Sequence, residues 1–114
     1  MHRTIQDLAG VVEVQPAAVV SKVIHRDGSL NVTVFGFDAG EGLTEHTASR
    51  AALIEIVRGR LDLTVDGETY DAAAGFWLHM AEGAPHALVA KEPTVMLLTM
   101  IGGHVVYEAD RSGL

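Results

Sequence analysis

The sequence predicts an all-β sandwich or barrel, because it breaks into about eight short apolar segments at nearly regular spacing, separated by turn-forming residues. Two further observations agree with this fold class. The chain has 12 glycines in 114 residues, and many turns in a short chain indicate many short strands. No long segment repeats its apolar residues with a helical period.

The first 16 residues predict an N-terminal segment that is short helical or extended. Residues 1–10 are compatible with one or two turns of helix, because two apolar residues lie three apart and Gly10 supplies a stop. Residues 11–14 are a short extended candidate. We expect this segment to cover an edge of the sheet.

Residues 17–25 and 30–38 predict the first hairpin. The first stretch is rich in Val and Ile, and the second alternates between two faces with a period of two. Residues 26–29 between them have the composition of a turn. Residues 39–50 are polar and contain glycine, so we expect a loop there, with His46 near its centre.

The dipeptide Asp66-Gly67 is the strongest local signal of a two-residue hairpin turn. Residues 58–60 predict a sharp turn or bulge. Residues 102–114 predict a C-terminal tail, within which residues 105–107 are a candidate for one more strand. We expect one domain, residues 1–114, with its core at about residues 20–101. The other expected strands span residues 51–57, 61–65, 68–71, 76–80, 84–90 and 94–101.

Charge and composition exclude several classes of function. The net charge is −7 and Lys and Arg do not cluster, which opposes binding to nucleic acid or to an anionic membrane. No apolar run reaches the ~18 residues of a membrane span. Cysteine is absent, which excludes thiol chemistry and suits a reducing compartment. We therefore expect a cytoplasmic protein.

Residues 75–86 place a histidine where it can bind something. An apolar run follows Gly75, with His79 inside it, and the turn formers Ala-Glu-Gly-Ala-Pro then end it. His86 comes directly after the turn and opens a new apolar segment. We expect this histidine at the mouth of a sheet.

Two blocks of the sequence resemble the two signature motifs of the cupin family. The first motif is a glycine, five residues, His-x-His, a Glu and a closing glycine, and here Gly40 is followed by five residues and His46, with Gly59 at the close. The second is a glycine, five residues, Pro-x-Gly, two residues, a His, three residues and an Asn. Here Gly75 is followed by five residues, Ala-Glu-Gly, two residues and His86. The resemblance covers roughly residues 20–101.

The resemblance implies a jelly-roll-like barrel, the double-stranded β-helix, with a ligand pocket inside it. It also implies a homodimer. The family usually binds one divalent metal with three histidines and a glutamate. The second histidine would fall at Ala48, the glutamate near residues 51–53, and the closing asparagine at Ala90. Of the usual ligands only His46 and His86 remain, so the resemblance makes these two the protein ligands of any Ni, Mn, Fe or Zn ion.

Other residues could complete the site. Glu55 shares a strand face with apolar residues, so a barrel-lining position would bury its carboxylate. His79 and Trp77 share a face of the 76–80 run and are further candidates for the pocket. Glu45 is adjacent to His46, and adjacent residues of an extended chain point to opposite sides. We expect the remaining histidines to be solvated: His2, His25 and His104.

Three functions are compatible with these observations, and the sequence does not decide between them. Small apolar residues at the family's ligand positions favour a dry pocket for an unidentified small molecule. His46 and His86 favour instead a metal-dependent enzyme, such as a dioxygenase or isomerase. A filled barrel would indicate a structural or partner-binding protein. No serine lies in a triad-like context and no phosphate-binding glycine loop is present, so the catalytic residues are unknown.

Overall fold

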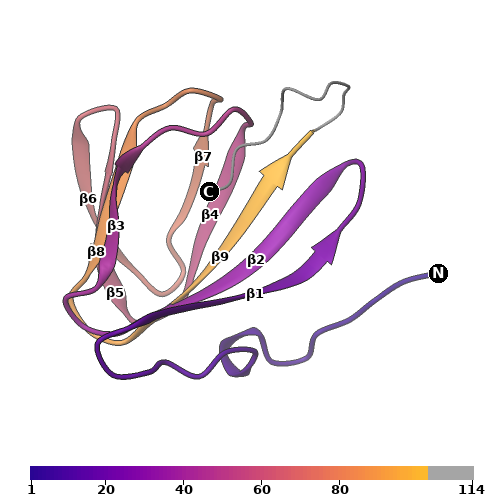
Figure 1. Cartoon of the computed structure of the whole chain (residues 1–114), viewed down its shortest axis with the longest axis horizontal. Coiled ribbons are helices and arrows are strands. Elements are labelled where there is room, and N and C mark those ends of the chain that lie inside the picture. Colours follow the sequence, from indigo (N-terminus) through magenta and orange to yellow (C-terminus); the bar gives the residue numbers. More distant parts are fainter. Residues whose placement is uncertain (103–114) are drawn as a thin grey trace.

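Residues 1–102 of the computed structural model can be described, and they form nine strands in two antiparallel sheets (Figure 1). The all-β fold that the sequence predicts is confirmed. The one helical element of this part of the chain is the short 3-10 helix η1 (Leu8–Gly10). The strands are β1 (Val19–Arg26), β2 (Leu30–Phe37), β3 (Gly42–His46), β4 (Ala52–Arg58), β5 (Arg60–Val65), β6 (Glu68–Ala73), β7 (Trp77–Met80), β8 (His86–Ala90) and β9 (Thr94–Ile101).

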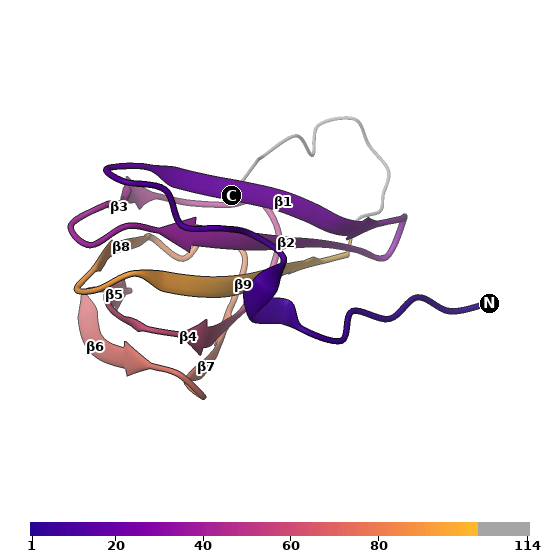
Figure 2. The same cartoon turned by 90° about the horizontal axis from the view of Figure 1, so that it is seen from below.

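The two sheets face each other and enclose the core. One has the strand order β1-β2-β9-β4-β7 and the other β3-β8-β5-β6. Figures 1 and 2 show the sheets curving toward each other as the walls of an open barrel. Alternate side chains of each strand fill the space between them, as the period of two requires. The large, fully buried apolar residues of this interior are Phe37, Ile54, Ile56, Leu61, Leu63, Met96 and Leu98.

The N-terminal segment covers the outer face of the larger sheet and not its edge. A Cβ atom built on Gly36 would lie 3.1 Å from a methyl carbon of Val12 and 3.3 Å from one of Val14. These valines therefore pack over Gly36, which has no side chain on the outer face of the sheet. The neighbouring Val34 of β2 is fully buried. Where the sequence predicts one or two turns of helix, the structure has only the three-residue 3-10 helix η1. Residues 11–14, the extended candidate, pair with no strand.

The loop expected at residues 39–50 contains a strand, β3. Its polar residues Thr44 and Glu45 are exposed, which hid the extended pattern in the sequence. The strand lies very close to β8, because a Cβ atom on Gly42 would come within 2.8 Å of the Val89 Cα atom and closer still to the Leu88 carbonyl. Glycine at this position therefore permits the pairing that places His46.

Glycines with positive φ form two of the connections between strands. Asp66 and Gly67 both have positive φ, 51° and 81°, so the predicted hairpin turn between β5 and β6 is confirmed. Gly59 lies where the chain crosses from one sheet to the other, with φ of 93°. A Cβ atom there would lie 2.4 Å from the Pro93 carbonyl oxygen, so only glycine fits.

No helix within residues 1–102 is long and apolar enough to cross a membrane. Beyond that part of the chain lie two features that the sequence predicts. They are His104 and the candidate strand at residues 105–107.

Candidate functional site

His46 and His86 meet at one end of the barrel. β3 ends at His46, β8 begins at His86, and the antiparallel register sets the two residues directly opposite each other. Their imidazole rings have centroids 4.2 Å apart and planes inclined at 55°. An irregularity in the pairing between Leu43 and His46 sets this register. The structure thus brings together the two histidines of the motif blocks.

Backbone contacts fix the tautomer of both rings. Nδ1 of His46 lies 2.7 Å from the Thr44 carbonyl oxygen, and Nδ1 of His86 lies 2.9 Å from the Ala84 carbonyl oxygen. A carbonyl oxygen can only accept a hydrogen bond, so each Nδ1 carries the proton. In the neutral ring the other nitrogen, Nε2, then holds a lone pair and can accept a hydrogen bond or bind a metal.

His86 is buried, with 2 % of its surface exposed, and its Nε2 atom has no hydrogen-bond partner. Burial lowers the pKa of His86, and the nearby His46 lowers it further, against the bond to the Ala84 carbonyl, which raises it. The ring is therefore neutral near pH 7. A neutral, buried acceptor without a partner is a site where a hydrogen-bond donor would be stabilised.

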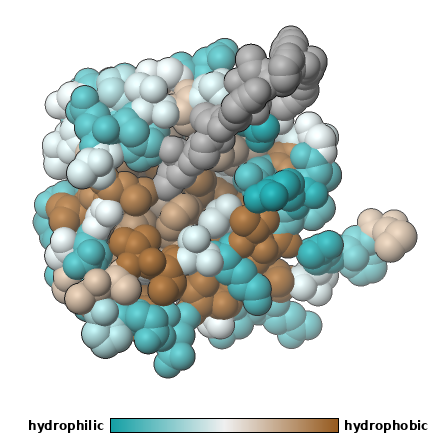
Figure 3. Space-filling model, viewed as in Figure 1, coloured by the Kyte–Doolittle hydropathy of each residue, from teal (hydrophilic) through white to brown (hydrophobic). Residues whose placement is uncertain are grey.

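The walls around the histidine pair are apolar. Ala48 and Ala52 are 7 % and 1 % exposed, and both belong to the interior cluster. Ala52 is flanked in its sheet by Met80 of β7 and Met100 of β9. Figure 3 shows hydrophobic residues gathered on the face that lies between the two sheets. Ala48, two residues after His46, and Ala52 thus place apolar side chains in the interior where the family carries metal ligands at or near these positions.

Three predicted pocket residues, Glu55, Trp77 and His79, lie on the outside of the barrel. All three are exposed, Trp77 by 59 %, and Trp77 is directly opposite Glu55 in the pairing of β7 with β4. The expectation that they line the pocket is corrected. Both faces of β4 are largely apolar, so the sequence alone did not fix which face points inward, and Ile54 and its same-face neighbours occupy the interior.

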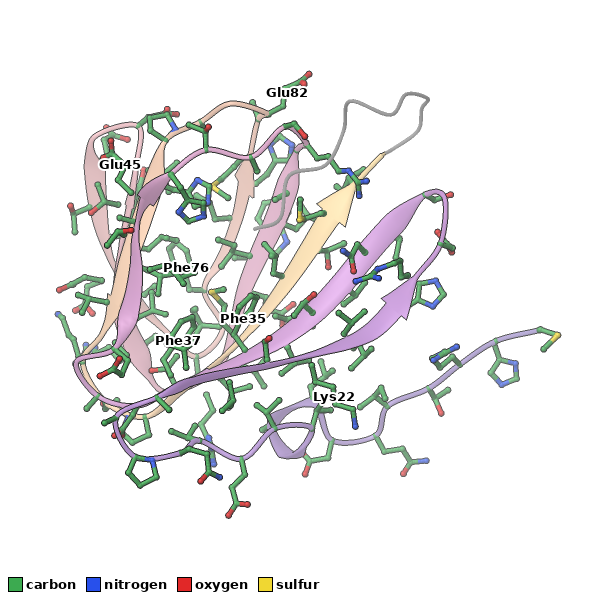
Figure 4. The ribbon with its side chains drawn as sticks, in the orientation of Figure 1. Lys22, Phe35, Phe37, Glu45, Phe76 and Glu82 are labelled. Carbon is green, nitrogen blue, oxygen red and sulfur yellow. The ribbon has the colours of Figure 1, made fainter. Side chains whose placement is uncertain are left out.

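The described residues do not rebuild the family's metal site. Within residues 1–102, no group of three or more His, Asp or Glu side chains is arranged to hold a metal ion. Glu45 is exposed, on the far side of β3 from the interior (Figure 4). The donor set is therefore two imidazoles, with the Nε2 atom of His86 buried, and no carboxylate, which fits a metal only in part.

A further polar residue, Asn31, lies outside both motif blocks. Its Oδ1 atom is buried and has no hydrogen-bond partner. Asn31 lies on the same face of β2 as Phe35 and Phe37, whose rings stack with centroids 5.7 Å apart and point into the barrel (Figure 4). The pattern did contain this information, since a polar amide shared a face with two phenylalanines.

Comparisons with known proteins agree on one family. The family model described as "Cupin domain" matches residues 33–102. A search of curated proteins finds no match. A conserved protein of unknown function from Streptococcus pyogenes has 31 % identity and a TM-score of 0.82, with 92 % of each chain covered. A cupin superfamily protein from Desulfitobacterium hafniense has 23 % identity and a TM-score of 0.80, covering 89 % of this chain and 92 % of that one.

A third similar structure is a Cupin 2 conserved barrel domain protein from Leptotrichia buccalis. It has 33 % identity and a TM-score of 0.77, and the match covers 82 % of this chain and 45 % of that one. The family match spans β2 to β9, the elements that carry both motif blocks. The resemblance in the sequence is thus confirmed, and the chain belongs to the cupin family.

Proposed function

We propose that this cupin binds a small, largely apolar molecule at the end of the barrel where His46 and His86 meet. One observation carries the proposal, the buried Nε2 atom of His86 with no partner. An unpaired buried acceptor costs about 1–3 kcal/mol, and a ligand that donates a hydrogen bond to it recovers that free energy. The role of His86 is then to orient the ligand.

The apolar surroundings support a dry ligand over a hydrated metal complex. Ala48 and Ala90 stand where the family has a histidine and an asparagine, and the glutamate would fall near residues 51–53, which include Ala52; all three alanines are buried. Each replacement removes a polar group and adds space. A pocket with apolar walls and one or two polar groups is the usual composition of a small-molecule site.

A metal-dependent enzyme, dioxygenase-like or isomerase-like, is the second candidate. The contacts of both Nδ1 atoms with backbone carbonyls favour it, because metal-binding histidines commonly donate their other N–H group in this way. His46 and His86 would hold Ni, Mn, Fe or Zn through their Nε2 atoms. The ion would supply Lewis-acid chemistry and would keep solvent at its other positions.

A fragment screen on metal-free protein tests the proposal. We expect at least one small molecule to raise the melting temperature of the wild type and of His79→Ala, but not of His86→Ala. His79 is the matched control, because it is a histidine of the same barrel on the outer face. Stabilisation by a divalent metal alone, lost in His86→Ala, would overturn the proposal in favour of the enzyme.

A further inference from the structure

We infer that two copies of this chain pair along the free edge of β1, so that their larger sheets join into one continuous sheet. The partner at this edge is a second copy, whose β1 runs antiparallel to the first. A two-fold axis passes through Ser21, the middle residue of the paired stretch. The pairing does not involve the histidine pair.

β1 is a long strand at the edge of the larger sheet. It has eight residues and stands at one end of the strand order, with β2 as its only neighbour among the described strands. Figure 2 shows β1 along one border of this sheet. An edge strand presents a row of backbone N–H and C=O groups that can bond to another strand. The open side of β1 is therefore able to accept a further strand.

The register shows which backbone groups of β1 point to that open side. The Asp38 N–H group donates a 3.1 Å hydrogen bond to the Ala18 carbonyl oxygen, and the pairing with β2 continues in the same register. In an antiparallel pair, residues that bond to the neighbouring strand alternate with residues that do not. The backbone groups of Val19, Ser21 and Val23 therefore point away from β2, and within residues 1–102 they have no hydrogen-bond partner.

This free stretch has a defined end on each side. Before β1 the backbone turns at Ala17, which has a φ of 53° and whose N–H group bonds to a carboxylate. After Val23 a bulge interrupts the pairing with β2. The Ile24 carbonyl oxygen there accepts a 3.2 Å hydrogen bond from the Arg3 guanidinium. Residues 19–23 thus remain for pairing with a second copy.

The stretch is complementary to itself about Ser21. In an interface with two-fold symmetry, residue i of one copy contacts residue j of the other, and j contacts i. Antiparallel pairing about Ser21 sets Val19 against Val23 of the second copy, and Ser21 against Ser21. All three residues carry the free backbone groups, so each meets a residue that can bond to it. A shift by one residue would set free groups against groups already bonded to β2.

The side chains of the stretch also suit a second copy. Val19 and Val23 are 37 % and 44 % exposed, although their partners Phe37 and Thr33 on β2 lie on the inner face of the sheet. The pairing brings these exposed valines together in two cross-strand pairs. On the other face Lys22 comes opposite Val20, so the two positive charges are not set against each other.

Charge favours this edge for contact between two copies. The chain has a net charge of −7, so two copies repel each other over much of their surfaces. Residues 19–23 contain no Asp or Glu, and Lys22 is their only charged side chain. The edge therefore lets two acidic chains approach without setting carboxylates against one another in the paired stretch.

Charge substitutions at the two valines test both the pairing and its register. Analytical ultracentrifugation should find the wild type as a dimer. Val19→Lys with Val23→Lys sets like charges opposite each other and should give a monomer. Val19→Lys with Val23→Glu sets opposite charges together and should keep the dimer. The two double variants change the same exposed positions, and circular dichroism checks that both fold.

Substitutions at the axis give a second, independent measurement. Ser21→Pro removes the N–H group that faces the open edge, where the fold of one chain tolerates proline, and should abolish the dimer. Ser21→Thr keeps that group and should keep the dimer. Trp77→Ser, at the opposite edge of the same sheet, should also leave it intact.

Three results would overturn the inference. The first is a wild type that remains monomeric at every concentration. The second is a dimer that persists when both valines are replaced by lysine. The third is a dimer that is lost in Trp77→Ser but kept in Ser21→Pro, which would place the contact between copies on the outer face near Trp77.

Discussion

The imidazole rings of His46 and His86 lie 4.2 Å apart, each with its Nδ1 atom held by a backbone carbonyl oxygen two residues earlier in the chain. Two strands from one sheet thus deliver two imidazole rings to one end of the barrel, each with Nδ1 as the hydrogen-bond donor. This arrangement is ready for a metal, but the alanines beside it remove the other ligands. We propose that the site instead accepts a hydrogen bond from a small molecule.

Restoring the missing ligands should restore metal binding. Ala48 and Ala52 are interior residues that follow His46 in the chain, so the double variant Ala48→His with Ala52→Glu adds an imidazole and a carboxylate to the existing pair. We expect its affinity for Zn²⁺ or Ni²⁺ to exceed that of the wild type at least roughly tenfold, because transition-metal sites use three or four protein ligands. Calorimetric titration measures both proteins.

The control places the same carboxylate on the other face of β4. Leu53 alternates with Ala52 and is paired with the exposed His79, so Ala48→His with Leu53→Glu carries the same added groups without directing both inward. Its affinity should fall below that of the first double variant. Equal affinities would mean that β4 does not present Ala52 to the histidine pair.

The buried imidazole predicts a loss of stability in mild acid. The pKa of His86 is lower in the folded chain than its ordinary value of 6.5, chiefly because of burial. The unfolded chain therefore binds more protons below pH 6.5, so the stability due to neutral His86 is complete above that pH. It is lost as the pH falls from 6.5 through the lower folded value.

Urea unfolding at pH 7.5, 6.5 and 5.5 measures this loss. The slope of the free energy of unfolding against pH should flatten in His86→Phe and stay as in the wild type in His79→Phe, where the changed histidine is exposed. If His86→Phe loses stability in acid as steeply as the wild type does, another group causes the loss.

Gly59 should tolerate no side chain. Gly59 and Gly75 both have positive φ, 93° and 96°, but a Cβ atom on Gly59 meets Pro93 and Thr94 whereas one on Gly75 meets nothing within 4 Å. Gly75→Ala should cost about 1–2 kcal/mol for the backbone alone. Gly59→Ala should cost more than about 3 kcal/mol. Chemical unfolding of the two variants checks this order. Equal losses in the free energy of unfolding would show that the backbone around Gly59 moves to make room for the added Cβ atom.

Asn31 should reduce the stability of the ligand-free protein. Asn31→Leu removes a buried, unpaired oxygen at a position that packs beside Met100. We expect the free energy of unfolding to rise by about 1 kcal/mol, with little change in Thr33→Val. A fall in stability for Asn31→Leu would mean that the amide makes a net stabilising contact in the free chain.

The sequence predicts the fold more completely than the site. Alternation, turn residues and the two motif blocks locate eight of the nine strands in residues 1–102, because each depends on neighbours close in the chain. β3 was missed because exposed Thr44 and Glu45 dominate its composition. The homodimer stays a prediction, since nothing in the fold of one chain requires a second copy.

The sequence predicted some site residues from a motif and others only from the face of a strand. The motif blocks predicted His46 and His86 at the same site, and the structure brings them together. The prediction for Glu55 depended on choosing the inward face of β4, whose two faces are both largely apolar, and His79 lies on the outward face of β7, opposite Leu78 and Met80. Asn31 lies outside both motifs, and only its place on the same face of β2 as Phe35 and Phe37 indicates that its side chain is interior.

The most direct test follows the ring nitrogens of His86 in a long-range ¹H–¹⁵N spectrum of metal-free protein at pH 7.5. The account predicts a protonated Nδ1 and an unprotonated Nε2, whose ¹⁵N resonance moves when a donor-bearing fragment from the screen is added. A protonated Nε2, or a resonance that moves with Zn²⁺ and with no fragment, would contradict it and make this end of the barrel a metal centre.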